Sequence, residues 1–211
     1  STQPNTLFPY TTLFRSVATD GAPGLIRAVE EVFPQSLRQR CLAHKLRNLG
    51  AKAPEERWRE VKAYALAAYQ ALSPLAAHAA AEEFRRRYAR EFPSAVACFE
   101  DDFEACIAHL RLPIAHRKAI RTTNLLERLF GEERRRTKII PHAFGERAVL
   151  KLMFAALARA SQSWRRLVIN EFELKQIEEL KTELHTEFQQ RTVPAALPTA
   201  SRLHFSSNNK T

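Results

Sequence analysis

The stretch that decides the fold is residues 17–33, "VATDGAPGLIRAVEEVF". It runs from a short apolar piece through Asp-Gly and Pro-Gly into a pattern with apolar residues at helical spacing. We predict a strand that ends at Asp20, a loop, and a helix over residues 24–33 that Pro34 ends. Domains of the α/β class place ligands beyond the carboxyl ends of strands, so Asp20 is a candidate functional carboxylate. Asp-Gly is also a common turn pair, and a plain turn role for Asp20 stays open.

A second strand is predicted within residues 36–44, "SLRQRCLAH", followed by a helix that begins near His44. Cys41 and His44 form a C-x2-H pair. Zinc would need two further ligands in the same cluster, and the other histidines are scattered, so a buried cysteine and a hydrogen-bonded histidine are favoured. Arg47 and Asn48 follow directly, as phosphate contacts or simply as exposed residues.

The region from Pro54 to Leu110 has a helical pattern throughout. Ser73 as N-cap and Pro74 at the first helical position are a strong start signal for the second helix. We predict three amphipathic helices without assigned chemistry, over residues 54–72, 73–92 and 93–110. A loop is predicted over residues 111–120.

Residues 121–138, "RTTNLLERLFGEERRRTK", predict a helix with a carboxylate ahead of three consecutive arginines. Helical spacing places Asn124, Glu127, Gly131 and Arg134 on one side and an apolar stripe on the other. Glu127 would then stand on a rim, beside basic residues. The alternative is an exposed helix held by Glu–Arg pairs, among them Glu127 with Arg128, each contributing only a few tenths of a kcal/mol.

The apolar stripe of this helix is expected to anchor it on a core, and its members are Leu125, Leu126, Leu129 and Phe130. A long apolar helix over residues 141–167 and a charged helix over 171–188 complete the pattern. The sequence thus predicts a mainly α chain of two short strands and seven helices.

The excess positive charge is confined to one part of the chain. Lys+Arg number 33 against 23 Asp+Glu, a net charge of +10. Residues 111–170 hold 14 Lys/Arg and 4 Asp/Glu, so this segment carries the whole excess. Such a concentration is typical of a nucleic-acid-binding surface. Three cysteines at unrelated spacings argue against a disulfide framework, and no apolar run approaches the ~20 residues of a membrane span.

Both ends of the chain look foreign to the fold. Residues 6–16, "TLFPYTTLFRS", resemble the in-frame translation of a sequencing adapter; the alternative is an ordinary aromatic, strand-like segment. We expect native sequence to begin near Val17 and residues 1–16 to be disordered. Residues 191–211 are rich in Pro, Ser, Thr and Asn and predict a disordered tail.

Four segments in order resemble the Mutator-type transposases of bacterial insertion sequences. They are "DGAPGLIRAVEEVFP", "QRCLAHKLRNL", "RTTNLLERLFGEERRRTKIIPHAF" and "KLMFAALARASQSWRRL", and the resemblance covers residues 17 to about 190. It implies a truncated RNase H-like α/β core interrupted by an all-helical insertion. The implied division is a core remnant at 17–50, the insertion at 51–115, and the closing helices of the core at 116–190.

The resemblance also implies an Asp-Asp-Glu catalytic triad. Asp20 matches the second Asp and Glu127 the Glu, while Cys41 and His44 match the C-x2-H signature, followed by Arg47 and Asn48. The first Asp is expected upstream of Val17, so this fragment alone is expected to be inactive. The complete enzyme would use two Mg²⁺ or Mn²⁺ ions held by carboxylates. The expected DNA-contacting residues are Arg121, Asn124, Arg128, Arg134, Arg135, Arg136 and Lys138.

The function expected from the resemblance is cutting insertion-sequence ends and joining them to target DNA. Such a protein would be cytoplasmic, associated with the bacterial nucleoid, without membrane contact, and possibly a homo-oligomer. Two other classes remain open: a non-enzymatic helical nucleic-acid-binding module, in which Glu127 only pairs with arginine, and a helical protein–protein scaffold. Metal-dependent cleavage would distinguish the transposase from the non-enzymatic module. Salt-sensitive DNA binding would distinguish both of these from the protein–protein scaffold.

Overall fold

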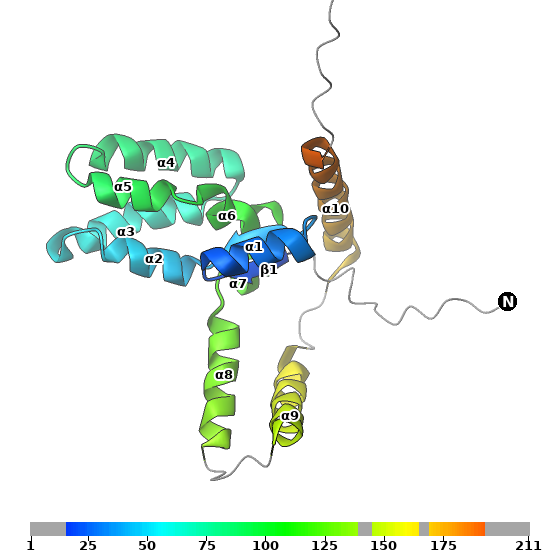
Figure 1. Ribbon diagram of the computed structural model, residues 1–211. Coiled ribbons are helices and arrows are strands. Elements are labelled where there is room, and N and C mark those ends of the chain that lie inside the picture. The colour runs from blue at the N-terminus through cyan, green and yellow to red at the C-terminus, as the bar shows by residue number, and fades with distance from the viewer. Residues whose placement is uncertain (1–15, 139–144, 165–168, 193–211) are drawn as a thin grey trace, which may run out of the picture.

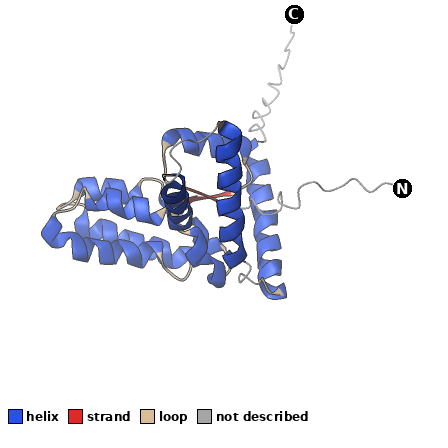
Figure 2. Cartoon of the chain, turned by 90° about the horizontal axis from the view of Figure 1, so that it is seen from below, coloured by secondary structure: helices blue, strands red, loops and turns tan. Residues whose placement is uncertain are grey.

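The computed structural model describes residues 16–138, 145–164 and 169–192, and it leaves out the side chains of Leu125, Arg136, Thr137 and residues 160–164. The described chain is mostly helix around one small sheet (Figure 2). The prediction of a mainly α chain with a small β part is therefore confirmed. The described residues form ten α-helices and a 3₁₀ turn rather than the seven helices predicted.

The sheet consists of β1 (Ser16–Thr19) and β2 (Leu37–Arg40), which pair in parallel with Thr19 opposite Arg40. The helix α1 (Pro23–Val32) connects them, as the strand, loop and helix pattern predicts. Two boundaries differ from the prediction. Ser16, expected to be foreign, is the first residue of β1, and β2 ends at Arg40, so Cys41 follows the strand. The Cys41 amide still donates to Thr19 O, at 2.7 Å.

Four helices form one packed layer beside the sheet (Figure 1). The N-cap prediction for α4 is confirmed, since the Ser73 hydroxyl accepts a hydrogen bond from the Ala76 amide at 3.2 Å and Pro74 opens the helix. A helix predicted to begin near His44 begins two residues earlier. The layer comprises α2 (Leu42–Gly50), α3 (Glu55–Tyr69), α4 (Pro74–Tyr88) and α5 (Pro93–Glu100).

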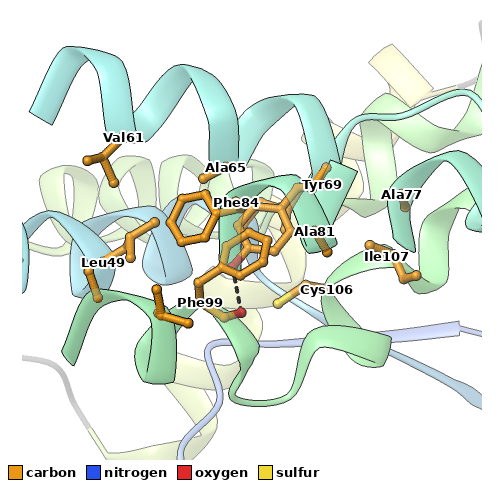
Figure 3. Packing of buried hydrophobic residues seen from close by; sticks show 14 of the residues in the cluster. Leu49, Val61, Ala65, Tyr69, Ala77, Ala81, Phe84, Phe99, Cys106 and Ile107 are labelled. Carbon is orange, nitrogen blue, oxygen red and sulfur yellow. Dashed lines mark hydrogen bonds between the residues drawn. The ribbon is translucent and has the colours of Figure 1, made fainter. Parts of the chain in front are cut away.

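Aromatic rings fill the core of this layer (Figure 3). The rings of Phe84 and Phe99 stack at a centroid distance of 4.0 Å, and Tyr69 stacks on Phe99 at 5.0 Å. All three side chains are fully buried. The Tyr69 hydroxyl donates to Phe99 O at 3.0 Å, which satisfies its polar end inside the apolar core.

The single helix predicted over residues 93–110 is wrong. The chain breaks at Asp101 and Asp102 into α5, then α6 (Phe103–Ile107) and the 3₁₀ turn η2 (Ala108–Arg111). Asp102 adopts a left-handed backbone conformation, with φ 57°. Its carboxylate receives both Arg38 guanidinium nitrogens at 2.5 and 2.6 Å, and the Lys45 ammonium donates to Asp101 O. These charged contacts join residues that are far apart in the sequence, and they stabilise the break. The apolar residues keep their helical spacing across it, so the sequence pattern does not reveal the break.

The loop predicted over residues 111–120 is also wrong, because α7 (Ile114–Ile120) occupies most of it. Pro113 serves as the N-cap and does not interrupt the helix. The Arg117 side chain folds back to donate to Leu112 O at 2.8 Å, which satisfies a carbonyl ahead of the helix. This helix crosses the predicted boundary between residues 115 and 116.

Two helices project from the body as an arm (Figure 1). They are α8 (Asn124–Thr137) and α9 (Glu146–Trp164), which contact each other. The predicted apolar anchor of α8 is only partly realised: Leu129 is buried, whereas Leu126 and Phe130 are 45% and 50% exposed. The Leu125 side chain lies outside the described residues, as do 141–144 and 165–167 of the predicted long helix.

The last helix, α10 (Glu171–Thr192), lies on the side of the sheet away from the helical layer (Figure 1). It extends the helix predicted over 171–188 by four residues, and so Arg191 and Thr192 belong to a helix and not to the predicted tail. The remaining predictions of disorder, for residues 1–15 and 193–211, fall outside the described chain. A second cluster of buried apolar residues, separate from the core of the helical layer, forms where α10 packs against β2 and η2. It contains Leu37, Ala108, Leu112, Leu180 and Leu184.

Candidate functional site

Asp20 follows the last residue of β1 and is exposed at the carboxyl edge of the sheet. Its Oδ1 accepts a hydrogen bond from the Ala22 amide at 2.9 Å, which closes the turn into α1. The plain turn role that the sequence left open is therefore present. A carboxylate has two oxygens, so the turn leaves acceptor capacity on Asp20 for a ligand.

Gly21 and Arg40 fix the shape of this turn. Gly21 has a positive φ of 92°, and a Cβ added there would overlap the Arg40 guanidinium. Arg40 is 7% exposed; its Nη1 lies 3.4 Å from Gly21 O and 3.5 Å from Asp102 Oδ2. No local sequence pattern pointed to Arg40, whose role depends on Asp102, far along the chain. It connects the Asp20 turn to the helical layer.

Cys41 joins the sheet to the start of α8. Its sulfur accepts two hydrogen bonds from Thr123, one from the backbone amide and one from the hydroxyl, both at 3.3 Å. A second connection runs alongside, from the Leu42 amide to Arg121 O at 2.9 Å. Burial acts to raise the pKa of the Cys41 thiol, but the hydrogen bonds from Thr123 and His44 outweigh it and lower the pKa to about 7.

Glu127 lies one helical turn beyond Thr123. Its Oε1 accepts a hydrogen bond from the Thr123 hydroxyl at 2.9 Å and is 3.7 Å from His44 Nε2. The side chain is 49% exposed. In the described part of the chain, these two residues hold Glu127, in place of the Arg128 partner that the alternative interpretation of this helix assigned to it.

The carboxylates of Asp20 and Glu127 are therefore attached to the same edge of the sheet. Thr19 precedes Asp20 and accepts from the Cys41 amide. The Cys41 sulfur accepts from the Thr123 amide, and the Thr123 hydroxyl donates to Glu127. Three segments that are far apart in the sequence meet in this path. Thr123, which connects them, was not among the residues predicted from the sequence.

The donor atoms at this edge suit a hard divalent cation, since Asp20 and Glu127 offer carboxylate oxygens. Their number is too small for a complete site. Among the described residues, no group of three or more His, Cys, Asp or Glu side chains could hold a metal ion. A zinc site at Cys41 and His44 lacks further ligands among the described residues for the same reason.

Several of the predicted DNA-contacting residues are exposed, and some of these also contact other parts of the chain. Arg121 donates to Gln70 Oε1 at 3.1 Å and Arg135 pairs with Glu132 at 2.8 Å. The Arg136 side chain lies outside the described residues. Exposed positions on α8 and at its C-terminal end are Asn124, Arg128, Arg134 and Lys138, and exposed positions on α2 are Arg47 and Asn48.

Glu127, Gly131, Arg134 and Lys138 follow one another at spacings of four, three and four residues, so they share one face of α8. A Cβ added at Gly131 would meet no described atom within 4 Å. This face therefore carries a carboxylate, an open gap and then two basic side chains.

A family profile described as "Transposase, Mutator family" matches residues 14–167, which include β1, β2, Cys41, His44 and the whole of α8. The chain belongs to the Mutator family of transposases. The resemblance expected from the four sequence segments is thereby confirmed.

Transposases of known insertion sequence elements match over about 70% of the chain. The transposase for insertion sequence element IST2 of Acidithiobacillus ferrooxidans is 33% identical over 145 residues, which are 69% of this chain and 49% of that protein. The transposase for IS6120 of Mycolicibacterium smegmatis is 32% identical over 146 residues, 69% of this chain and 45% of that protein. The chain thus spans about half the length of these relatives. In the described ranges, no helix combines the length and the apolar character needed to cross a bilayer.

Proposed function

We propose that this Mutator-family chain is the portion of a DNA-cutting and DNA-joining transposase that carries two of the three metal-binding carboxylates, Asp20 and Glu127. The observation that carries the proposal is the hydrogen-bonded path through Cys41 and Thr123, which attaches Glu127 to the edge where Asp20 stands. Parallel strands and their connecting helix are consistent with an RNase H-like core whose remaining strands and first Asp precede Val17.

The proposed roles follow from the geometry of each side chain. Asp20 is held by its turn with an oxygen to spare, and Glu127 is half exposed with one oxygen engaged by Thr123. Both would contribute hard oxygen ligands to Mg²⁺ or Mn²⁺. Bound divalent cations supply activation of the attacking oxygen and stabilisation of the leaving one in phosphodiester chemistry.

The DNA backbone would lie along the Glu127 face of α8. Arg134 and Lys138 are exposed on that face, one and two further turns beyond the gap at Gly131. At 1.5 Å of rise per residue, Arg134 stands about 10 Å along the axis from Glu127. The basic side chains would neutralise phosphates beside the cut.

The non-enzymatic DNA-binding module remains the rival proposal, supported by the exposed basic residues of α8. The two proposals differ in their requirement for metal. A titration of the chain with manganese tests this difference, with binding measured from the relaxation rate of water protons. We expect weak binding that Asp20→Asn or Glu127→Gln each reduces about tenfold, which corresponds to the loss of ~1.4 kcal/mol.

The matched control is Glu133→Gln, another carboxylate on α8, which should leave manganese binding unchanged. Equal affinity in the parent chain and both site variants would reject the metal role of the two carboxylates. Mg²⁺-dependent cleavage by the chain extended with its upstream coding sequence, and its loss in Glu127→Gln, would test the whole enzyme.

A further inference from the structure

Cys41 occupies a position that the proposed chemistry does not use. It is fully buried at the point where β2 ends and α2 begins, and it is the N-cap residue of α2. Its sulfur faces Thr123, the N-cap residue of α8. One side chain thus joins the first turns of two helices that are 82 residues apart at this contact.

The Thr123 hydroxyl has two acceptors but only one proton. Glu127 Oε1 lies 2.9 Å from it and Cys41 Sγ lies 3.3 Å from it. It can donate to only one of them at a time. The Thr123 backbone amide, in contrast, has Cys41 Sγ as its acceptor, so the backbone stays fixed whichever way the hydroxyl turns.

The spacing of Cys41 and His44 fits the same arrangement. Residues three apart in the first turn of a helix lie on one side, so both side chains face α8. Cys41 contacts Thr123, and His44 Nε2 lies 3.7 Å from Glu127 Oε1. The C-x2-H pair thereby contacts the first helical turn of α8 at two points.

We propose that Cys41 is a positioning residue for Glu127, an inference that rests on the proposed function. Its sulfur anchors the N-terminus of α8 through the Thr123 amide. The sulfur is also the second acceptor for the Thr123 hydroxyl, so it accepts that hydrogen bond when Glu127 turns its oxygen to a cation.

The test compares Cys41→Ala, Cys41→Ser and Cys106→Ala in the metal-free chain. Hydrogen exchange of the Thr123 amide, measured by NMR, should become about tenfold faster in Cys41→Ala, because the amide loses its acceptor. Cys41→Ser should restore most of the protection. Cys106 is also fully buried but contacts the helical core, so Cys106→Ala should leave Thr123 exchange unchanged.

A second readout follows the Glu127 side chain. Thr123→Val removes the hydroxyl and keeps the amide, so Thr123 protection should persist while the three-bond couplings of Glu127 average over rotamers. Thr123→Ser should restore a single rotamer. Unchanged Thr123 exchange in Cys41→Ala, or unchanged Glu127 couplings in Thr123→Val, would overturn the positioning role.

Manganese titration of the same variants separates this inference from the proposed function. If the parent chain binds manganese through Glu127, Cys41→Ala should weaken binding and Cys41→Ser should recover it. Equal manganese binding in Cys41→Ala and the parent chain would contradict the inference. Failure of the parent chain to bind manganese would reject the metal site, while the exchange and coupling measurements would still decide whether Cys41 holds Glu127 in place.

Discussion

The helical layer and the α8–α9 arm are built on different principles. In the layer, stacked aromatic rings are fully buried and surface charges are paired, as in Arg87 with Glu60 at 2.6 Å. On the arm, large apolar residues stand in solvent: Phe154 is 73% exposed and Leu150 is 56% exposed. The excess positive charge of the chain is confined to residues 111–170, which contain the arm.

The difference shows where the stability and the proposed chemistry of the chain reside. A densely packed layer supplies its own free energy of folding and can support a site beside it. The position of the arm depends on its attachment at Thr123 and on the surfaces that pack against it or bind it. The predictions below test this division, beginning with the largest effect.

The core of the layer should be the most sensitive region. Phe99→Ala removes a ring that stacks on both Phe84 and Tyr69, and we expect the free energy of unfolding to fall by about 3–5 kcal/mol. Phe154→Ala on the arm is the matched control and should change it by less than about 0.5 kcal/mol. Urea denaturation measures both values. Similar losses for the two variants would remove the contrast between layer and arm.

The contact between η2 and β2 should make the free energy of unfolding depend on pH. His109 is buried, its amide donates to Gln39 Oε1 at 2.7 Å, and burial lowers its pKa to about 4. The unfolded chain binds a proton near pH 6.5 and the folded chain does not. The free energy of unfolding is therefore highest above pH 6.5 and falls between pH 6.5 and 4, and the loss reaches about 3 kcal/mol below pH 4.

Urea denaturation at several pH values measures this loss. His109→Gln should flatten the dependence between pH 6.5 and 4. His78→Gln, on the exposed surface of α4, should retain it. An unchanged slope in His109→Gln would mean that another group controls acid stability.

A substitution in the Asp20 turn should destabilise the chain, whereas one in the neighbouring first turn of α1 should not. Gly21→Ala places a side chain at a positive φ and against Arg40, so we expect a loss of about 1–3 kcal/mol. Gly24→Ala, where an added Cβ meets no described atom within 4 Å, should instead stabilise the chain by about 0.4–1 kcal/mol. Thermal unfolding of the two variants gives the comparison, and equal losses would show that Arg40 does not hold the turn.

The arm should dominate DNA binding. Replacing both Arg134 and Lys138 by Gln should lower the slope of log affinity against log salt by about 2, since each phosphate contact contributes ~0.9. The control replaces Arg59 and Lys62, two exposed basic residues of α3, and should leave the slope unchanged. Fluorescence anisotropy over a salt series measures it, and equal slopes for both double variants would move the DNA surface off the arm.

Local signals in the sequence predicted several elements correctly. Ser73 and Pro74 determine the start of α4, the Asp20–Gly21 pair marks the turn after β1, and Pro23 opens α1. These features depend on neighbours within a few residues. The alternation of strand, helix and strand was predictable for the same reason, because α1 connects two strands that are adjacent in the sequence.

Features that depend on distant residues were not predictable from the sequence. The break at Asp102 is held by Arg38 and Arg40, and apolar spacing continues through it. Pro113 suggested a loop, yet it opens α7. Asp20 and Glu127 were proposed from motifs, but Thr123 and Arg40, which connect them to the fold, carry no local pattern. Only the tertiary contacts reveal what holds the candidate site.

The contacts of β2 also set an order of assembly during synthesis on a ribosome. Arg38 precedes its partner Asp102 by 64 residues, Gln39 precedes His109 by 70, and Cys41 precedes Thr123 by 82. The strand therefore leaves the exit tunnel long before anything can satisfy its charged and polar groups. The helical layer is translated between the strand and these partners, so the chain can fold a scaffold before the edge that bears Asp20 is complete.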